Sequence, residues 1–260
     1  MFLATITLCR LMNTSLRSIF LLVIAVLTLA ACTSSSDKPT STASTTQRTD
    51  SIKVPPQQPS AEYTELAVRQ TAEAGKKVEV VEFFAYFCSH CKSFDPMLSE
   101  WARKNADHVV FKRVPVAFRD TMIPQQRMYY ALEAMGKLDD LHGIIFEAIQ
   151  VQRLALDSDR AIFDFVVKQN IDATKFKELY ESFAVRSQSK MASEMQRAYN
   201  INSVPNIAID GRFITSASHA SQRPGVRRTE EGLQTATLQI MDDLVAKVQR
   251  ERQSGSPERK

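Results

Sequence analysis

The sequence has few of the nitrogen and sulfur ligands that zinc prefers, because only four histidines and four cysteines occur among its 260 residues. Cys88 and Cys91 form a Cys-x-x-Cys pair, which can supply half of a structural zinc site. The other half is missing, since Cys9 and Cys32 lie in the N-terminal leader and no two histidines have a zinc-binding spacing. We therefore expect neither a metal site nor a bound cofactor in the folded part of the chain.

The sequence also lacks a strong excess of charge of one sign. Its formal charge is +4, and removal of a leader that contains Arg10 and Arg17 lowers this to about +2. Such a small charge does not create the field that attracts nucleic acid or an anionic membrane surface. We therefore expect no nucleic-acid partner, and attachment to a membrane would need another cause.

Residues 1–31 have the features of an export signal. Arg10 and Arg17 precede the apolar run Ile19–Ala31, and no acidic residue occurs in the leader. The run is too short to span a bilayer but has the length of a signal-peptide core. Met12 is an alternative start, because the chain from Met12 still has a basic residue before the apolar run.

A possible site of lipid attachment follows the apolar run. Leu29–Cys32 resembles the bacterial lipobox, in which the cysteine after small residues is acylated and becomes the new N-terminus. Ordinary cleavage at an Ala-x-Ala site is the alternative, but Cys32 occupies the one position that lipidation requires. Residues 32–60 are rich in Ser, Thr, Pro and Gln and cannot bury enough surface to offset their ordering entropy. We predict a disordered, acylated tether on the periplasmic side of the inner or the outer bacterial membrane.

Residues 61–252 are predicted to form one folded unit of ordinary domain size, followed by a polar tail over 253–260. Val78–Ala85 has the pattern of a buried strand, Ser89–Arg103 that of a helix with one apolar face, and His108–Val116 that of a second strand. The order strand, helix, strand predicts a βαβ unit with parallel strands.

Helical periodicity replaces the strand pattern over about residues 121–190. Four segments carry apolar residues at helical spacing: Met128–Met135, Leu141–Ile149, Ile162–Val167 and Phe176–Phe183. Strand signals return at Asn206–Ile209, and Asp210–Gly211 before Arg212–Ile214 predicts a two-residue hairpin turn. Gly232–Arg250 carries one apolar stripe and should form a final helix on the sheet. The predicted fold is an α/β sheet with an all-helical insert.

The Cys-x-x-Cys pair follows a buried strand directly, which places both thiols in the first turn of a helix. Free amide groups and the helix dipole stabilise a thiolate there. Cys88 lies nearest the helix start and is the predicted nucleophile, and Cys91, one turn further in, is the predicted resolving thiol. His90 would add a hydrogen-bond donor or a positive charge, although an ordinary surface histidine is the alternative. The pair predicts a redox-active Cys88–Cys91 disulfide.

Two motifs together indicate a family. Glu82–Cys91 contains Glu-Phe-Phe-x-x-Phe-Cys-x-His-Cys, and Ser203–Gly211 contains Ser-Val-Pro followed by Asp-Gly. In this order, and with a helical insert between them, the motifs resemble the DsbA family of periplasmic thiol:disulfide oxidoreductases in the thioredoxin superfamily, over about residues 61–250. The resemblance implies a thioredoxin-like fold with an all-helical domain inserted between the βαβ unit and the C-terminal hairpin and helix. The lipobox and tether resemble the membrane-anchored branch, and Ser89 departs from the proline that many members carry.

The resemblance also implies roles for single residues. Pro205 would be a cis proline that lies against the disulfide and leaves the backbone of Val204 free to pair with an extended substrate; a trans proline at the start of a strand is the alternative. Glu82 would be a buried acid that assists proton transfer, whereas the residue pattern alone is equally consistent with an edge position. Phe87 and Ser89 are expected to contact the substrate with Val204.

The implied function is the oxidation of cysteine pairs in newly exported proteins by a monomeric enzyme. The resemblance further implies re-oxidation by a quinone-linked inner-membrane partner of the DsbB type. A reductase or isomerase that uses the same pair is the enzymatic alternative and would have a lower reduction potential. A peptide-binding holdase that uses an aromatic surface around Phe84, Tyr86 and Phe87 is the non-enzymatic alternative.

Overall fold

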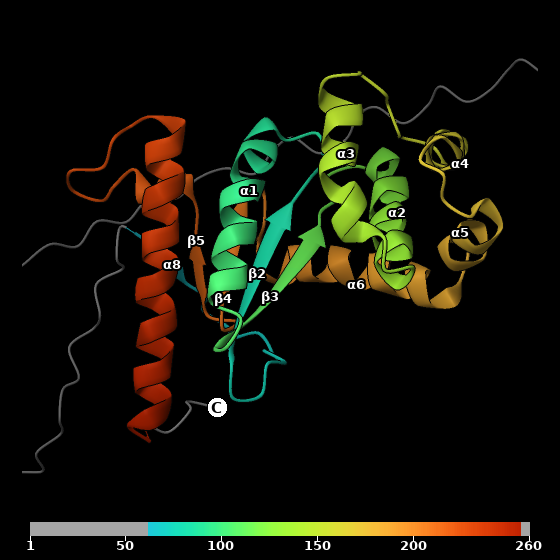
Figure 1. The fold of residues 1–260 in the computed structure, drawn as a ribbon. Helices are drawn as coiled ribbons and strands as arrows, with labels where there is room; N and C mark the ends of the chain where they lie inside the picture. Colours follow the sequence, from blue (N-terminus) through green and yellow to red (C-terminus); the bar gives the residue numbers. More distant parts are fainter. Residues whose placement is uncertain (1–61, 256–260) are drawn as a thin grey trace, which may run out of the picture. The chain divides into compact units, whose positions relative to one another are not determined.

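The computed structural model describes residues 62–255 (Figure 1). The predicted signal peptide, Cys32 and the predicted tether lie outside the described residues. The strands are β1 (Thr64–Glu65), β2 (Val78–Phe84), β3 (Val109–Pro115), β4 (Asn206–Ile209) and β5 (Phe213–Thr215). The helices are α1 (Ser89–Lys104), the short 3₁₀ helix η1 (Asp120–Met122), α2 (Ile123–Ala134), α3 (Leu138–Gln150), α4 (Asp159–Lys168), α5 (Ala173–Tyr180), α6 (Phe183–Ala198), α7 (Ala217–Ala220) and α8 (Glu230–Gln253).

The five strands form one mixed sheet in the order β1-β5-β4-β2-β3. Strands β2 and β3 are parallel with α1 between them in the chain, which confirms the predicted βαβ unit, and β4 pairs antiparallel with β2 and β5. Every residue of β2 is buried, as expected for a strand that has neighbours on both sides. Because β2 is held on both sides, its carboxyl end gives α1 a fixed starting point.

Helix α1 contacts α8 on one side and α3 of the helical insert on the other (Figure 1). One face of β2 packs against α1 and α8 in an apolar cluster that includes Val78, Val80, Phe94, Leu98, Trp101 and Ile240. The opposite face joins the core of the insert, through residues that include Val81 and Phe83. The indole of Trp101 also donates a 2.7 Å hydrogen bond to Asp242 of α8. The active-site helix is therefore fixed between two larger helical elements.

The helical insert follows the predicted periodicity, with one difference. The side chains of Ser158 and Asp172 cap α4 and α5. The predicted segment Phe176–Phe183 is divided, because Ser182 accepts a hydrogen bond from the Val185 amide and starts the separate helix α6. Helix α6 continues to Ala198. None of the helices within residues 62–255 has both the length and the apolarity needed to cross a membrane.

The Asp-Gly hairpin forms where the sequence predicts it. Asp210 and Gly211 have φ angles of 54° and 64°, and a Cβ on Gly211 would lie 2.1 Å from the carbonyl oxygen of Gln70, so only glycine fits. Ile209 pairs with Phe213, so the connection has one residue more than predicted. The buried Asp210 carboxylate bonds Arg69 at 2.9 Å and Arg252, a residue in the last turn of α8. This contact attaches the end of α8, which is longer than predicted, to the sheet.

Candidate active site

The backbone places the two thiols as the sequence predicts. Cys88 is the N-cap of α1, with extended φ and ψ of −83° and 115°. The amide of Cys91 points at the Cys88 sulfur at 3.4 Å, and the amide of Cys88 bonds the Ala85 carbonyl at 3.0 Å. Cys88 is half-buried whereas Cys91 is fully buried. An attacking group from solvent therefore reaches Cys88 first.

The two thiols differ strongly in acidity. A hydrogen bond from the Cys91 thiol lowers the pKa of Cys88 to about 6, with help from the amides of Cys91 and His90 and the charge of His90, while burial opposes the shift. Burial raises the pKa of Cys91, and the hydrogen bond to Cys88 and the charge of Glu82 raise it further. At neutral pH the pair therefore carries one thiolate, on Cys88, and one thiol, on Cys91.

His90 is held by a residue from the far end of the sequence. Its Nδ1 lies 2.8 Å from the carboxylate of Glu230, in the first turn of α8. The hydrogen bond to Glu230 raises the pKa of His90. Glu230 also accepts a hydrogen bond from Ser93, whose hydroxyl accepts one from Gln234 at 2.8 Å. The sequence motif predicts a role for His90 but gives no sign of Glu230, because Glu230 lies 140 residues away in the chain.

Glu82 is buried in the interior strand β2 rather than at an edge. Burial raises the pKa of Glu82 to about 7, although Arg113 of β3 lies 3.1 Å from its carboxylate and acts in the opposite direction. Arg113 also bonds Asp95 of α1 at 2.7 Å. Burial opposes ionisation of Asp95, but its contacts with His142 and Arg113 prevail and lower its pKa. A carboxyl group that titrates near neutral pH therefore lies behind Cys91.

His142 of α3 extends this network into the helical insert. Its Nδ1 lies 2.9 Å from the Tyr86 hydroxyl and its Nε2 lies 3.5 Å from Asp95. Burial lowers the pKa of His142. The neutral tautomer with its proton on Nε2 satisfies both contacts. The sequence does not reveal this role, although a histidine within the apolar segment Leu141–Ile149 is a signal of a buried polar contact.

The Val-Pro loop lies against the reactive sulfur. The Val204–Pro205 bond is cis, as the family resemblance implies, and the Cys88 sulfur lies 3.3 Å from the Val204 carbonyl oxygen, to which it donates when it is protonated. Asn206 donates to the Ser203 carbonyl at 2.9 Å and so fixes the approach to this loop. Pro205, Val204 and Cys88 are therefore neighbours despite more than a hundred intervening residues.

The apolar surface beside the thiols differs from the predicted one. Phe84 and Tyr86 are fully buried and pack on His142 and Phe146 of the insert, so the prediction that they form an exposed aromatic surface is wrong. Of the three predicted residues, only Phe87 is exposed, at 43%. Its ring packs on the exposed ring of Phe118, with centroids 6.4 Å apart. Ser89 and His90 are exposed at the start of α1.

Comparisons with known proteins identify relatives of this chain. The model of a family described as thioredoxin matches residues 72–223. The thiol:disulfide interchange protein DsbA of Burkholderia cepacia is 36% identical over 179 residues, which cover 69% of this chain and 79% of that protein. DsbA of Pseudomonas aeruginosa is 34% identical over 152 residues, covering 58% of this chain and 72% of that protein.

Solved structures show the same fold. The crystal structure of Pseudomonas aeruginosa DsbA superposes with a TM-score of 0.66 at 30% identity, over 74% of this chain and 94% of that one. A DsbA oxidoreductase from Neisseria meningitidis gives a TM-score of 0.62 at 25% identity, again over 74% and 94%. With its Cys88–Cys91 pair at the start of α1 and its inserted helices, the chain belongs to the DsbA family of thiol:disulfide oxidoreductases.

Proposed function

We propose that this protein donates disulfide bonds to cysteine-containing proteins that have been exported in an unfolded state. The observation that carries the proposal is the asymmetry of the two thiols, since Cys88 is accessible with a pKa of about 6 and Cys91 is buried with a raised pKa. A stable Cys88 thiolate favours the reduced enzyme and therefore makes its disulfide a good oxidant. The name shared by the relatives, thiol:disulfide interchange protein, supports the same assignment.

The first step is attack by a substrate thiolate on the Cys88 sulfur of the oxidised enzyme. The Cys88–Cys91 bond breaks, the electron pair goes to Cys91, and a mixed disulfide forms between the substrate and Cys88. Because the pKa of Cys91 is raised, its sulfur takes up a proton, and Glu82, which titrates near neutral pH, is suited to supply it. We assign Glu82 as the group that assists this proton transfer.

The second step releases the product. The second substrate thiolate attacks the substrate sulfur of the mixed disulfide, and Cys88 leaves as a thiolate. Its low pKa makes it a good leaving group. The substrate loses two electrons and the enzyme gains them, so each cycle requires re-oxidation, which we assign to a quinone-linked inner-membrane partner of the DsbB type.

We assign substrate contacts to Phe87, Ser89 and Val204, with Pro205 positioning the loop that carries Val204. The Val204 carbonyl lies beside the Cys88 sulfur, where an extended substrate chain would approach. The Phe87 ring offers an apolar contact next to the thiol. His90 is suited to stabilise the Cys88 thiolate by its charge.

We further propose a periplasmic, lipid-anchored monomer. The lipobox predicts acylation of Cys32 and removal of residues 1–31. Residues 32–60 would then tether the folded unit, residues 61–252, to the membrane. Intact-mass analysis of protein purified from cells should find an acylated Cys32 at the N-terminus, and an unmodified Cys32 would overturn this part of the proposal.

Equilibration of the full chain with glutathione tests the direction of the reaction. We expect a reduction potential well above the value of about −270 mV that is typical of thioredoxin. Oxidised enzyme should also oxidise a reduced two-cysteine peptide stoichiometrically. A potential near that of thioredoxin would instead favour the reductase. The aromatic surface predicted for a holdase does not form, because two of its three residues are buried.

A further inference from the structure

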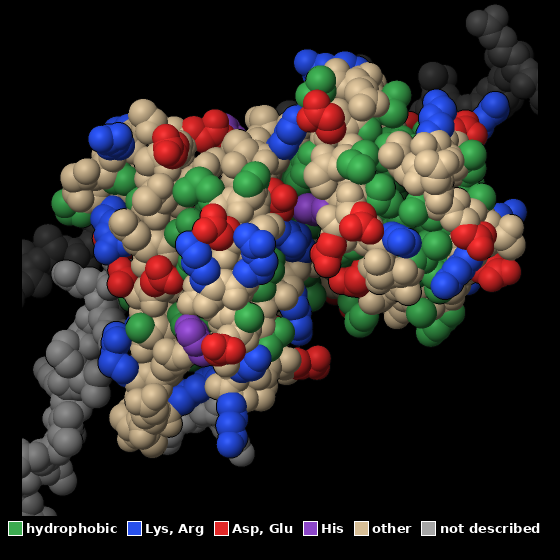
Figure 2. Space-filling model, viewed as in Figure 1, with side chains coloured by type: hydrophobic (Ala, Val, Ile, Leu, Met, Phe, Trp, Pro, Cys, Tyr) green, Lys and Arg blue, Asp and Glu red, His purple; other side chains and the backbone are tan. Residues whose placement is uncertain are grey.

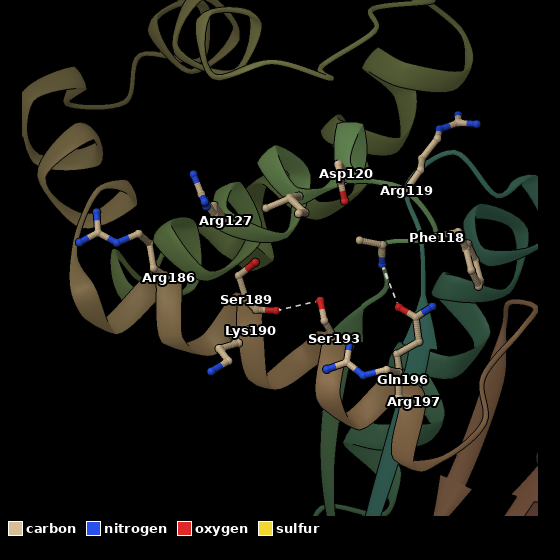
Figure 3. Close-up of a pocket in the computed structure, with 12 residues that line it drawn as sticks. Phe118, Arg119, Asp120, Arg127, Arg186, Ser189, Lys190, Ser193, Gln196 and Arg197 are labelled. Atoms are coloured by element: carbon tan, nitrogen blue, oxygen red, sulfur yellow. Dashed lines mark hydrogen bonds between the residues drawn. The ribbon is translucent and has the colours of Figure 1, made fainter. Parts of the chain in front are cut away.

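A cationic pocket lies between α6 and the segment that joins β3 to α2 (Figure 3). Its volume is about 480 Å³. Five basic side chains and a single carboxylate, Asp120, line it; the basic residues are Arg119, Arg127, Arg186, Lys190 and Arg197. Arg186 and Arg119 lie at opposite ends in Figure 3, so positive charge extends along the whole pocket. On the face seen in Figure 2, by contrast, basic and acidic side chains are interspersed.

The positive charges of this pocket are poorly neutralised. Among residues 62–255, neither Arg119 nor Arg197 forms an ion pair, and the buried Nε of Arg127 has no hydrogen-bond partner. Lys190 forms an exposed ion pair with Glu194, at 3.8 Å. An unpartnered, buried guanidinium nitrogen is costly. The pocket is therefore suited to an anionic ligand, and guanidinium groups favour carboxylates, which they bind with two hydrogen bonds.

The walls of the pocket are held in place by hydrogen bonds. The Gln196 side chain of α6 accepts a hydrogen bond from the Ala117 amide at 3.1 Å, and the Ser193 hydroxyl bonds the Ser189 carbonyl at 3.2 Å (Figure 3). The contact with Ala117 fixes the backbone directly before Phe118. The hydrogen bond to Ala117 thus holds α6 of the insert against the segment after β3, so the two sides of the pocket keep a fixed spacing.

Two packed aromatic rings link the pocket to the residue beside the reactive thiol. Phe118 lines the pocket and packs on Phe87, the residue directly before Cys88. A substrate chain that leaves the Cys88 sulfur across these two exposed rings arrives at the basic residues. This proximity to the thiol favours part of the substrate protein as the occupant, since a separate membrane-binding surface would not need to lie near the thiol.

We propose that the pocket binds acidic segments of substrate proteins and so selects cysteines that have Asp or Glu residues nearby in sequence. This inference rests on the proposed oxidase function and names a substrate class for it. The positive charge acts mainly by increasing the rate of productive encounter, which salt should suppress.

Competition between two reduced peptides tests the proposal. Both contain the same cysteine pair, and one has a glutamate-rich flank where the other has a glutamine-rich flank. We expect the oxidised full chain to react about tenfold faster with the acidic peptide at low salt, and to lose most of this preference at high salt. The double variant R186E/R197E should lose the preference, and R186K/R197K should keep it. The ratio of the two rate constants cancels any loss of folded protein.

A matched control separates the pocket from net charge. The variant K76E/K137E reverses two exposed charges outside the pocket and should keep the preference. Equal rates for the two peptides with the wild type would overturn the pocket assignment while leaving the oxidase intact. Oxidation of neither peptide would overturn the proposed function instead. Charge-dependent binding to phosphatidylglycerol vesicles that R186E/R197E abolishes, without a peptide preference, would reassign the pocket to a lipid surface.

Discussion

The two thiols lie only three positions apart in the chain, yet their electrostatic surroundings differ sharply. Around Cys88 the groups are exposed: His90 and Glu230 have side chains that are 70% and 52% accessible. Behind Cys91 they are buried: Arg113 and Glu82 are 16% and 2% accessible. Water screens the outer pair and leaves the inner network unscreened. The outer groups therefore adjust only the pKa of Cys88. The inner groups interact strongly with one another, and Glu82 among them titrates near neutral pH.

The largest expected effect comes from replacing one thiol at a time. Cys91→Ser should accumulate mixed disulfides with substrates, since Cys88 remains accessible and no second thiol resolves them. Cys88→Ser should form none, because Cys91 is buried. Non-reducing gels of acid-quenched cells measure both. Equal trapping by the two variants would contradict the assignment of Cys88 as the attacked sulfur.

The inner network should be costly to break. Arg113→Met removes the cation between Glu82 and Asp95 and leaves two buried carboxylates without it. We expect a loss of about 3 to 5 kcal/mol in the free energy of unfolding at pH 8. The control Arg160→Met breaks an exposed pair with Asp164 and should cost less than about 1 kcal/mol. Urea unfolding measures both, and similar losses would mean that burial does not distinguish the two pairs.

Glu82 should make stability depend on pH. Its folded pKa of about 7 lies above its ordinary value of 4.5, so its contribution to stability is fully present below about pH 4.5 and is lost as pH rises through 7. The wild type should therefore lose about 3 kcal/mol between pH 5 and 8 that Glu82→Gln retains. Unfolding of the oxidised proteins measures this without titrating thiols. Parallel profiles for the two proteins would refute the raised pKa.

Cys88 should affect the fold in the opposite direction. Its pKa is lowered from 9.0 to about 6 by the hydrogen bond from Cys91, so the thiolate stabilises reduced protein above about pH 9 and this stabilisation is lost as pH falls through 6. At pH 7 we expect about 1 kcal/mol, after allowing for the partial exposure of Cys88. Reduced protein should then melt above oxidised protein, and the gap should narrow in acid. A higher melting temperature for oxidised protein would favour the reductase.

The smallest effect should come from the outer pair. Glu230→Gln removes the carboxylate that raises the pKa of His90, so the pKa of Cys88 should rise, although by less than in His90→Gln. Thiolate absorbance against pH measures this shift. The neighbouring exposed residue Glu231 provides the control, since Glu231→Gln removes the same charge. An equal shift in both glutamate variants would show that net charge, and not the contact with His90, is responsible.

The sequence by itself determined the local structure. Alternation of apolar residues, the Cys88 position at a helix start, the caps Ser158 and Asp172 and the Asp210–Gly211 turn all depend on groups within a few residues. Hydrogen bonds and dihedral preferences between residues this close in the chain depend on short sequence patterns, which a sequence shows directly. The order of these patterns then indicated the α/β fold and the family.

Only the tertiary structure decided which distant side chains meet. Glu230 contacts His90, Arg113 joins Glu82 to Asp95, and His142 reaches Tyr86 across separations of about twenty to more than a hundred residues. It also buried Phe84 and Tyr86 against the insert, where the sequence suggested an exposed surface. Long side chains have many rotamers, and packing of whole elements selects among them. The position of the thiols at a helix start therefore follows from the local sequence, whereas their pKa values depend on distant residues that the fold brings next to them.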